Sequence, residues 1–241
     1  MPVIGIPVRY DYSKDENKTI LYIFESVRRS IQKAGGDIYL LLPIQDVDYM
    51  VVKNNEFKPF TEEETKKINT MLDKCDGLFL PGGIKFTPFD KYILDYSIKK
   101  DIPTLGVCLS MQMMSCYQEE TSLTKIESDI NHHQVEKDYV HTVKIDKNSK
   151  LYEMVGKEEI MVNSNHLYQV SENHIYKTTA KSPDGVVEAI EHPTATFNIG
   201  VQWHPEKIYD IDEYARAIID RFIKEAVNFS ESKKAYEDEI I

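Results

Sequence analysis

The sequence predicts an α/β protein with a mostly parallel central sheet, flanking helices and added antiparallel strands. In the first half of the 241 residues, short apolar runs alternate with helix-like segments in units of about 30 residues, as in βαβ units. In the second half, short strand-like segments follow one another, as in antiparallel sheets. No linker or repeat divides the chain. We therefore expect one domain over residues 1–241, with a charged C-terminal extension over 230–241.

The first half supplies the expected parallel strands and the helices between them. Buried strands are predicted from apolar runs at 3–8, 37–43, 77–80 and 104–107. Helices are predicted at 19–34, 61–73, 90–100 and 109–117. The first of these helices should stop at Gly35-Gly36, and the second opens with the capping box Thr61-Glu-Glu-Glu64.

The second half supplies the expected antiparallel strands, at 139–145, 173–179, 185–191 and 197–203. An amphipathic helix is predicted over 211–229, with Tyr214, Ile218, Phe222 and Ala226 on one stripe. The residues that follow it are highly charged. They are interpreted as a solvated extension, with a small docking segment as the alternative.

Charge and composition exclude several classes of partner. The formal net charge of −11 leaves no basic patch for nucleic acid or for an anionic membrane surface. No run approaches 18 apolar residues, and the N-terminus lacks a signal peptide's basic and apolar regions, so we expect a cytoplasmic protein. The three cysteines have no metal-ligand spacing and suit a reducing compartment. Cys75 and Cys116 are expected in the core.

The segment Pro103–Gln112 predicts a cysteine nucleophile. Cys108 falls between an expected strand and an expected helix, and Gly106 permits a tight turn. At a helix N-terminus, the dipole and the free N–H groups favour a thiolate. Cysteine is also a common small core residue, so this motif indicates catalysis only together with a residue that can activate the thiol.

That partner is expected near the C-terminus, in Gly200-Val-Gln-Trp-His-Pro-Glu206. His204 can act as the base for a thiol, and Glu206 can accept the other imidazole N–H and fix its orientation. Open α/β sheets place ligands at the carboxyl ends of their strands, where the Cys108 turn, Pro81-Gly82-Gly83 and His204 should meet.

Two loops are expected to complete the site. Gly82 and Gly83 allow close backbone approach, and the N–H groups of Gly83 and Leu109 could form an oxyanion hole. The polar run Asn163–Gln169 suits substrate binding, although a solvated loop is equally simple. His132, His133 and His141 lack an accompanying ligand pattern, so no metal is expected.

Together these residues resemble the class I glutamine amidotransferase superfamily, and more closely its γ-glutamyl hydrolase branch, typified by γ-glutamyl-γ-aminobutyrate hydrolase (peptidase family C26). The resemblance spans nearly the whole chain. Its motifs are Ile4-Gly-Ile-Pro7, Ala34-Gly-Gly36, Leu80-Pro-Gly-Gly83, Leu105-Gly-Val-Cys108, His133-Gln134, His141-Thr-Val143, Asn163-Ser-Asn-His166, Ser182-Pro-Asp-Gly-Val-Val-Glu-Ala189 and Val201-Gln-Trp-His-Pro-Glu206.

The resemblance implies a flavodoxin-like amidotransferase fold and a role for each motif. Cys108 is the implied nucleophile, His204 the general base and acid, and Glu206 the orienting carboxylate. Gly83 and Leu109 are the implied oxyanion hole, and Gly82, Gln112, Ser164 and His166 are the expected substrate contacts. The implied reaction releases an amine from a small γ-glutamyl substrate through a γ-glutamyl thioester. No metal or organic cofactor is expected, and the family suggests a homodimer.

The chain departs from the family pattern near the nucleophile. The usual Gly-x-Cys-x-Gly-x-Gln has Ser110 in place of its second glycine, and Leu109 replaces an arginine common in the branch. After Gly83, Ile84-Lys85-Phe86 replaces a pattern with Asp. We interpret Ser110 as altered specificity, and Lys85 or Phe86 as a changed acceptor pocket.

Three functions remain open from the sequence. A stand-alone thiol hydrolase of γ-glutamyl amides or peptides is preferred, because Cys108, His204 and Glu206 are all present. A glutaminase subunit that passes ammonia to a synthetase partner would use the same residues. An amidotransferase-like binding protein without catalysis would be consistent with the departures at 109 and 110.

Overall fold

The computed structural model describes residues 1–53, 56–117, 123–172 and 174–240. The strands are β1 (Val3–Pro7), β2 (Arg9–Ser13), β3 (Lys18–Tyr22), β4 (Asp37–Leu41), β5 (Gly77–Leu80), β6 (Thr104–Val107), β7 (Thr124–Lys125), β8 (His141–Ile145), β9 (Glu159–Val162), β10 (Tyr168–Gln169), β11 (Lys177–Lys181), β12 (Val187–Glu191) and β13 (Asn198–Val201). The helices are α1 (Glu25–Lys33), α2 (Glu62–Leu72), α3 (Pro88–Lys100), α4 (Leu109–Tyr117), α5 (Lys150–Val155), α6 (Pro205–Ile208) and α7 (Glu213–Ile240).

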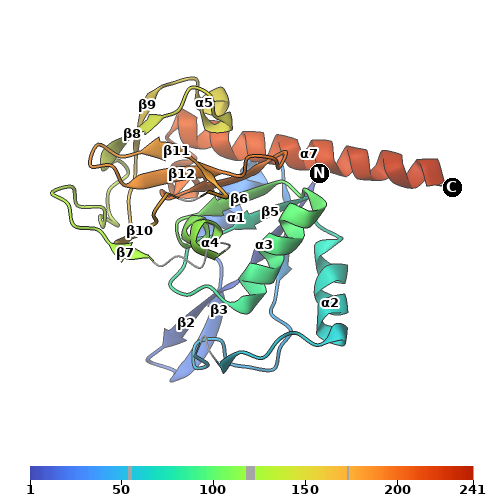
Figure 1. Cartoon of the computed structure of the whole chain (residues 1–241). Coiled ribbons are helices and arrows are strands. Elements are labelled where there is room, and N and C mark those ends of the chain that lie inside the picture. The colour runs from blue at the N-terminus through green and yellow to red at the C-terminus, as the bar shows by residue number, and fades with distance from the viewer. Residues whose placement is uncertain (54–55, 118–122, 173, 241) are drawn as a thin grey trace.

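The predicted fold class is confirmed by the central sheet. Among the described residues, nine strands lie in the order β4-β1-β5-β6-β13-β12-β11-β8-β9 (Figure 1). The strands from β4 to β13 pair in parallel, and those from β12 to β9 pair antiparallel. The parallel strands β1, β5, β6 and β13 therefore end at one edge, where loops gather.

Two apolar layers cover the two faces of the sheet. One layer includes Ile4 and Ile6 of β1 and buried side chains of α1, α5 and α7. The other includes Leu78 and Leu80 of β5 and buried side chains of α2, α3 and α4. The alternation of side chains along each strand produces this division. Figure 1 shows α7 running along the sheet and continuing beyond it to the C-terminus.

Several predicted elements are confirmed in detail. Strands β1, β4, β5 and β6 occupy the four predicted apolar runs. Helix α2 begins with both hydrogen bonds of the Thr61–Glu64 capping box. Helix α3 begins at Pro88, two residues before the predicted start, because Thr87 and Asp90 form a second capping box.

The predicted helix over 19–34 is wrong in its first part. Residues 18–22 form β3, which pairs with β2 in a hairpin, and only Glu25–Lys33 is helical. Asn17 adopts a left-handed φ of 52° at the turn, a conformation that asparagine tolerates. Ile20 is exposed on this hairpin, so its place in a helical apolar pattern was coincidental.

The second half contains the expected strands with shifted bounds, although β13 pairs in parallel with β6 as well as antiparallel with β12. β8 starts at His141, β12 starts at Val187, and β13 covers 198–201. β11 covers 177–181, later than predicted, and Asn173 lies outside the described residues. The edge strand β9 and the small β7–β10 pair were not predicted.

The C-terminal helix is longer than predicted. Ile218, Phe222 and Ala226 are fully buried, which confirms the apolar stripe. The helix then continues through the charged extension to Ile240, and Ile241 lies outside the described residues. Lys233 donates a hydrogen bond to the Asp73 carbonyl, so the extension begins against the end of α2. No helix among the described residues is long and apolar enough to cross a membrane.

Candidate active site

Cys108 occupies a strained turn between β6 and α4. Its φ of 52° lies in the left-handed region, which costs a residue with a side chain about 1–2 kcal/mol. The turn is held on both sides, because the Cys108 N–H donates to Val201 O at 2.8 Å and its carbonyl accepts from Gln112 N at 3.0 Å. The sulfur lies 4.0 Å from the carbonyl oxygen of Asn165.

His204 and Glu206 form a buried pair beside this turn. His204 follows β13, the parallel neighbour of β6, and Pro205 begins α6 immediately after it. The imidazole Nδ1 lies 2.7 Å from Glu206 Oε1. Burial alone would lower the pKa of His204, but the negative charges of Glu206 and Cys108 outweigh it and raise that pKa to about 10. The site therefore stabilises an imidazolium.

Asn163 fixes the backbone of His204 in place. Its Oδ1 accepts the His204 N–H at 2.8 Å, and its Nδ2 donates to the His204 carbonyl at 2.8 Å. This two-point contact links the loop after β9 to the loop after β13. The polar run that begins at Asn163 was predicted to bind substrate, but this member of it positions the histidine.

Gly82 packs against both the histidine and the cysteine. A Cβ at this position would lie 2.8 Å from His204 Cε1 and 3.3 Å from Cys108 Cβ. The backbone of the Pro81–Gly83 turn thus packs directly against both groups. Only glycine leaves room for that approach.

A buried arginine, which the sequence analysis missed, holds this turn from below. Arg9 is 2% exposed, and its guanidinium donates to the carbonyls of Pro81 and Gly82. In a trans peptide unit, the carbonyl and the following N–H point in opposite directions. Because the Gly82 carbonyl faces Arg9, the Gly83 N–H faces away from it. Arg9 thereby orients a predicted oxyanion donor, and its position just after β1 was the available signal.

Arg9 also connects the Pro81–Gly83 turn to α4 and to α3. Its Nη1 lies 2.5 Å from Asp90 Oδ1, and both side chains are buried. Its Nη2 donates to Ser110 Oγ at 2.7 Å, and Ser110 Oγ donates to Pro81 O at 2.8 Å. Ser110 therefore braces the Pro81–Gly83 turn and does not line the cavity. Its interpretation as a specificity residue is revised, because its hydroxyl is used within this network.

A cavity of about 380 Å³ opens above Cys108. It is lined by residues from four loops and from the start of α4: Gly83, Ile84, Cys108, Leu109, Gln112, Leu123, His133, Asn165, His166, Leu167 and Tyr168. Five of the predicted site residues therefore lie on its wall, namely Gly83, Cys108, Leu109, Gln112 and His166. Gln112 Nε2 donates to Tyr168 O and to Gln202 Oε1.

Two predicted substrate contacts lie elsewhere. Ser164 donates to the His132 carbonyl at 2.8 Å and is buried behind the cavity wall. Gly82 packs against His204 and is not on the wall. The departure at Lys85 also acts away from the cavity, because its ammonium donates to the carbonyls of Tyr49 and Val52. Among the described residues of that segment, Ile84 is the one that meets the cavity.

The histidines considered for a metal separate into two environments. His133 lies on the cavity wall. His132 and His141 lie together in the interior with His166 and Glu188, two residues that sequence spacing did not connect to them. His166 belongs to both environments.

Comparison with known proteins agrees with this architecture. The family model for peptidase C26 matches residues 87–206. Protein NtpR of Enterococcus hirae is 28% identical over 93% of this chain and 99% of its own length. A protein of Schizosaccharomyces pombe named putative glutamine amidotransferase PB2B2.05 is 30% identical over 64% of this chain and 71% of its own. The glutaminase domain of Trypanosoma brucei CTPS superposes with a TM-score of 0.65, at 18% identity, over 95% of this chain and 94% of that one.

The fold, the turn that carries Cys108 and these similarities define a class I glutamine amidotransferase-like protein. Within that superfamily, the chain belongs to the peptidase C26 family. This membership supports a hydrolase with an amidohydrolase- or glutaminase-type role.

Proposed function

We propose that the protein is a stand-alone thiol hydrolase of γ-glutamyl amide bonds. The observation that carries the proposal is the placement of Cys108, on a strained turn and beside the buried His204–Glu206 pair, at the floor of a cavity. A strained nucleophile next to an imidazole that a carboxylate orients is the arrangement of thiol acyl transfer.

In the proposed reaction, the Cys108 sulfur attacks the γ-carbonyl carbon while His204 holds the thiol proton. The carbonyl oxygen becomes an oxyanion that accepts hydrogen bonds from the N–H groups of Gly83 and Leu109. The C–N bond then breaks, and His204 gives its proton to the departing amine. A water, deprotonated by His204, attacks the thioester and releases glutamate and the free thiol.

The cavity suggests where the two halves of the substrate bind. Gln112 and His133 place polar side chains on the cavity wall with Cys108. Ile84, Leu123 and Leu167 form an apolar part of the wall. We place the γ-glutamyl group against the polar groups and the amine half against the apolar ones.

The test is hydrolysis of γ-glutamyl-p-nitroanilide and of glutamine by the purified protein, with glutamate and amine quantified. We expect turnover of the anilide, loss of at least 10³-fold in Cys108→Ala, and wild-type rates in Cys75→Ala. Equal rates for the wild type and Cys108→Ala would overturn the proposal. Turnover of glutamine alone would replace it with a glutaminase.

A further inference from the structure

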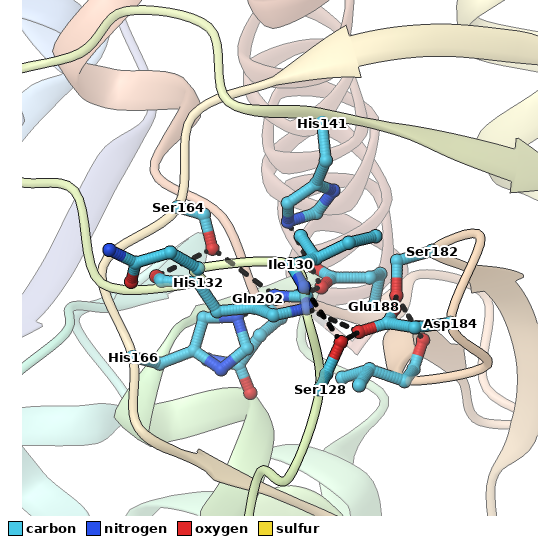
Figure 2. Close-up of polar contacts among 12 residues, drawn as sticks. Ser128, Ile130, His132, His141, Ser164, His166, Ser182, Asp184, Glu188 and Gln202 are labelled. Atoms are coloured by element: carbon cyan, nitrogen blue, oxygen red, sulfur yellow. Dashed lines mark hydrogen bonds and ion pairs between the residues drawn. The ribbon is translucent and has the colours of Figure 1, made fainter.

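A second polar cluster lies inside the antiparallel half of the protein. His141 opens β8, Glu188 lies in β12, and His132 and His166 come from two loops. The four residues are between 0% and 5% exposed. Figure 2 shows the imidazoles and the carboxylate converging, with Asp184 beside them. The proposed hydrolysis uses none of their facing atoms.

The distances from Glu188 to the three imidazoles are close to those between ligands around one ion. Glu188 Oε1 lies 3.3 Å from His132 Nδ1, 3.5 Å from His141 Nε2 and 3.6 Å from His166 Nε2. All four atoms lie within 4.8 Å of one another. Two ligands of a tetrahedral ion bound at about 2.0–2.1 Å are about 3.3–3.4 Å apart. Direct N–H···O hydrogen bonds are shorter, at about 2.7–3.2 Å.

The hydrogen bonds of the outer ring nitrogens determine which nitrogen of each imidazole carries the hydrogen, and so which one faces the centre of the cluster with a lone pair. His141 Nδ1 lies 3.1 Å from Thr142 O, and His166 Nδ1 lies 3.0 Å from Tyr168 O. His132 Nε2 lies 3.0 Å from Asp184 Oδ2. Carbonyl and carboxylate oxygens only accept, so these nitrogens carry the hydrogens. In neutral imidazoles, the inward nitrogens are then acceptors.

The atoms that face the centre of the cluster are thus hydrogen-bond acceptors, and they surround the Glu188 carboxylate. Among the described residues, His141 Nε2, His166 Nε2 and both Glu188 carboxylate oxygens make no hydrogen bond. A buried carboxylate surrounded by lone pairs is costly unless a cation joins it. Metal-bound histidines commonly donate their other N–H to a carboxylate or a carbonyl, as all three do here. Ser128 and Ser182 in turn donate to Asp184.

We propose that His132, His141, His166 and Glu188 bind one Zn²⁺ ion in a closed, four-ligand site. Three imidazoles and one carboxylate in a tetrahedral arrangement suit zinc. With four buried protein ligands, the ion is structural. It joins β8, β12 and two loops, and through His166 it holds Asn165, whose carbonyl faces Cys108. This proposal replaces the expectation of no metal.

The test measures metal in untagged protein, so that no histidine tag contributes. We expect about one Zn²⁺ per chain by mass spectrometry of the metal content. After removal of the metal with dipicolinate, Co²⁺ should restore one equivalent and give the visible absorption bands of a tetrahedral site. Zn²⁺ at 100 times its Kd should raise the melting temperature by roughly 5–10 °C.

The variants Glu188→Gln and His141→Gln keep side-chain size and remove one ligand each. We expect each to lose at least 100-fold in Zn²⁺ affinity and to lose the Co²⁺ bands. His192→Gln is the matched control, because that histidine lies outside the cluster and should bind metal as the wild type does. Circular dichroism identifies variants that fail to fold, and the wild-type titration remains decisive in that case. A folded wild type without saturable one-to-one binding, or unchanged cobalt spectra in both folded variants, would overturn the proposal and leave a proton as the cation.

Discussion

At the scale of single residues, Cys108 and Cys75 are both buried but lie in different environments. Burial raises the pKa of the Cys75 thiol to about 12, and Asp76 contributes to the increase, so that thiol stays protonated near neutral pH. Cys108 faces an imidazole that the structure stabilises in its charged form. Brief iodoacetamide treatment should therefore label Cys108 at least 10-fold faster than Cys75, as read by peptide mass spectrometry.

The same labelling experiment tests whether His204 activates the Cys108 thiol. His204→Gln should slow the alkylation of Cys108 at least 10-fold and leave that of Cys75 unchanged. Equal labelling of the two cysteines in the wild type, insensitive to His204, would indicate a catalytically silent relative.

The raised pKa of His204 also predicts how stability depends on pH. An unfolded histidine has a pKa of about 6.5, whereas the folded value is about 10. Between these values the folded state holds a proton that the unfolded state has lost. The contribution is therefore complete below about pH 6.5 and disappears as the pH rises through the folded value. Urea unfolding should show the stability difference between wild type and His204→Gln shrinking from pH 6 to pH 9.5. A constant difference would contradict this ion pair.

Ser110 provides a prediction about positioning. Ser110→Ala removes the hydroxyl that joins Arg9 to Pro81 O. Loss of one such hydrogen bond is worth about 0.5–1.5 kcal/mol, so kcat should fall about 2- to 13-fold. KM should not change, because Ser110 does not line the cavity. Steady-state kinetics on γ-glutamyl-p-nitroanilide measure kcat and KM separately. A change in KM alone would indicate that Ser110 acts in specificity.

At the scale of elements, the Pro81–Gly83 turn must remain free of side chains. Gly82→Ala would push a methyl group against His204 and Cys108. We expect kcat/KM to fall at least 100-fold while the chain still folds. Gly185→Ala is the control, because its Cβ meets open space at a φ of 86°. That variant should lose about 1–2 kcal/mol of stability and keep its activity. Wild-type kinetics in Gly82→Ala would show that the turn is not in contact with the reacting groups.

The sequence predicted those elements near the site that depend on neighbouring residues, and it missed the features that depend on residues far apart in the chain. The apolar runs of β1, β5 and β6 and the Thr61 capping box could be read from neighbouring residues alone. The β2–β3 hairpin could not, because Ile20 fits helical spacing as well as strand alternation. Arg9 contacts residues 72 to 101 positions away, and Glu188 lies 56 residues from His132 and 22 from His166. No short-range pattern reveals such pairings.

At the scale of the whole molecule, the two apolar layers share one sheet. Strand β5, for example, contributes Phe79 to one layer and Leu78 to the other, so the two layers cannot separate without breaking its pairing. We expect one cooperative unfolding transition, as a single domain predicts. Trp203 is the protein's single tryptophan, is 1% exposed and belongs to one layer. Its fluorescence and far-UV circular dichroism should therefore give the same midpoint in urea, and two separate midpoints would show two folding units.

The cavity also has two structural origins. Its floor, with Cys108, is attached to paired parallel strands at the centre of the sheet. Its apolar rim, with Ile84, Leu123 and Leu167, comes from loops outside the strands. Substitutions at the rim can therefore accumulate without disturbing bond cleavage. Such a division lets one scaffold diversify in the molecules that it accepts while the residues at the floor stay the same.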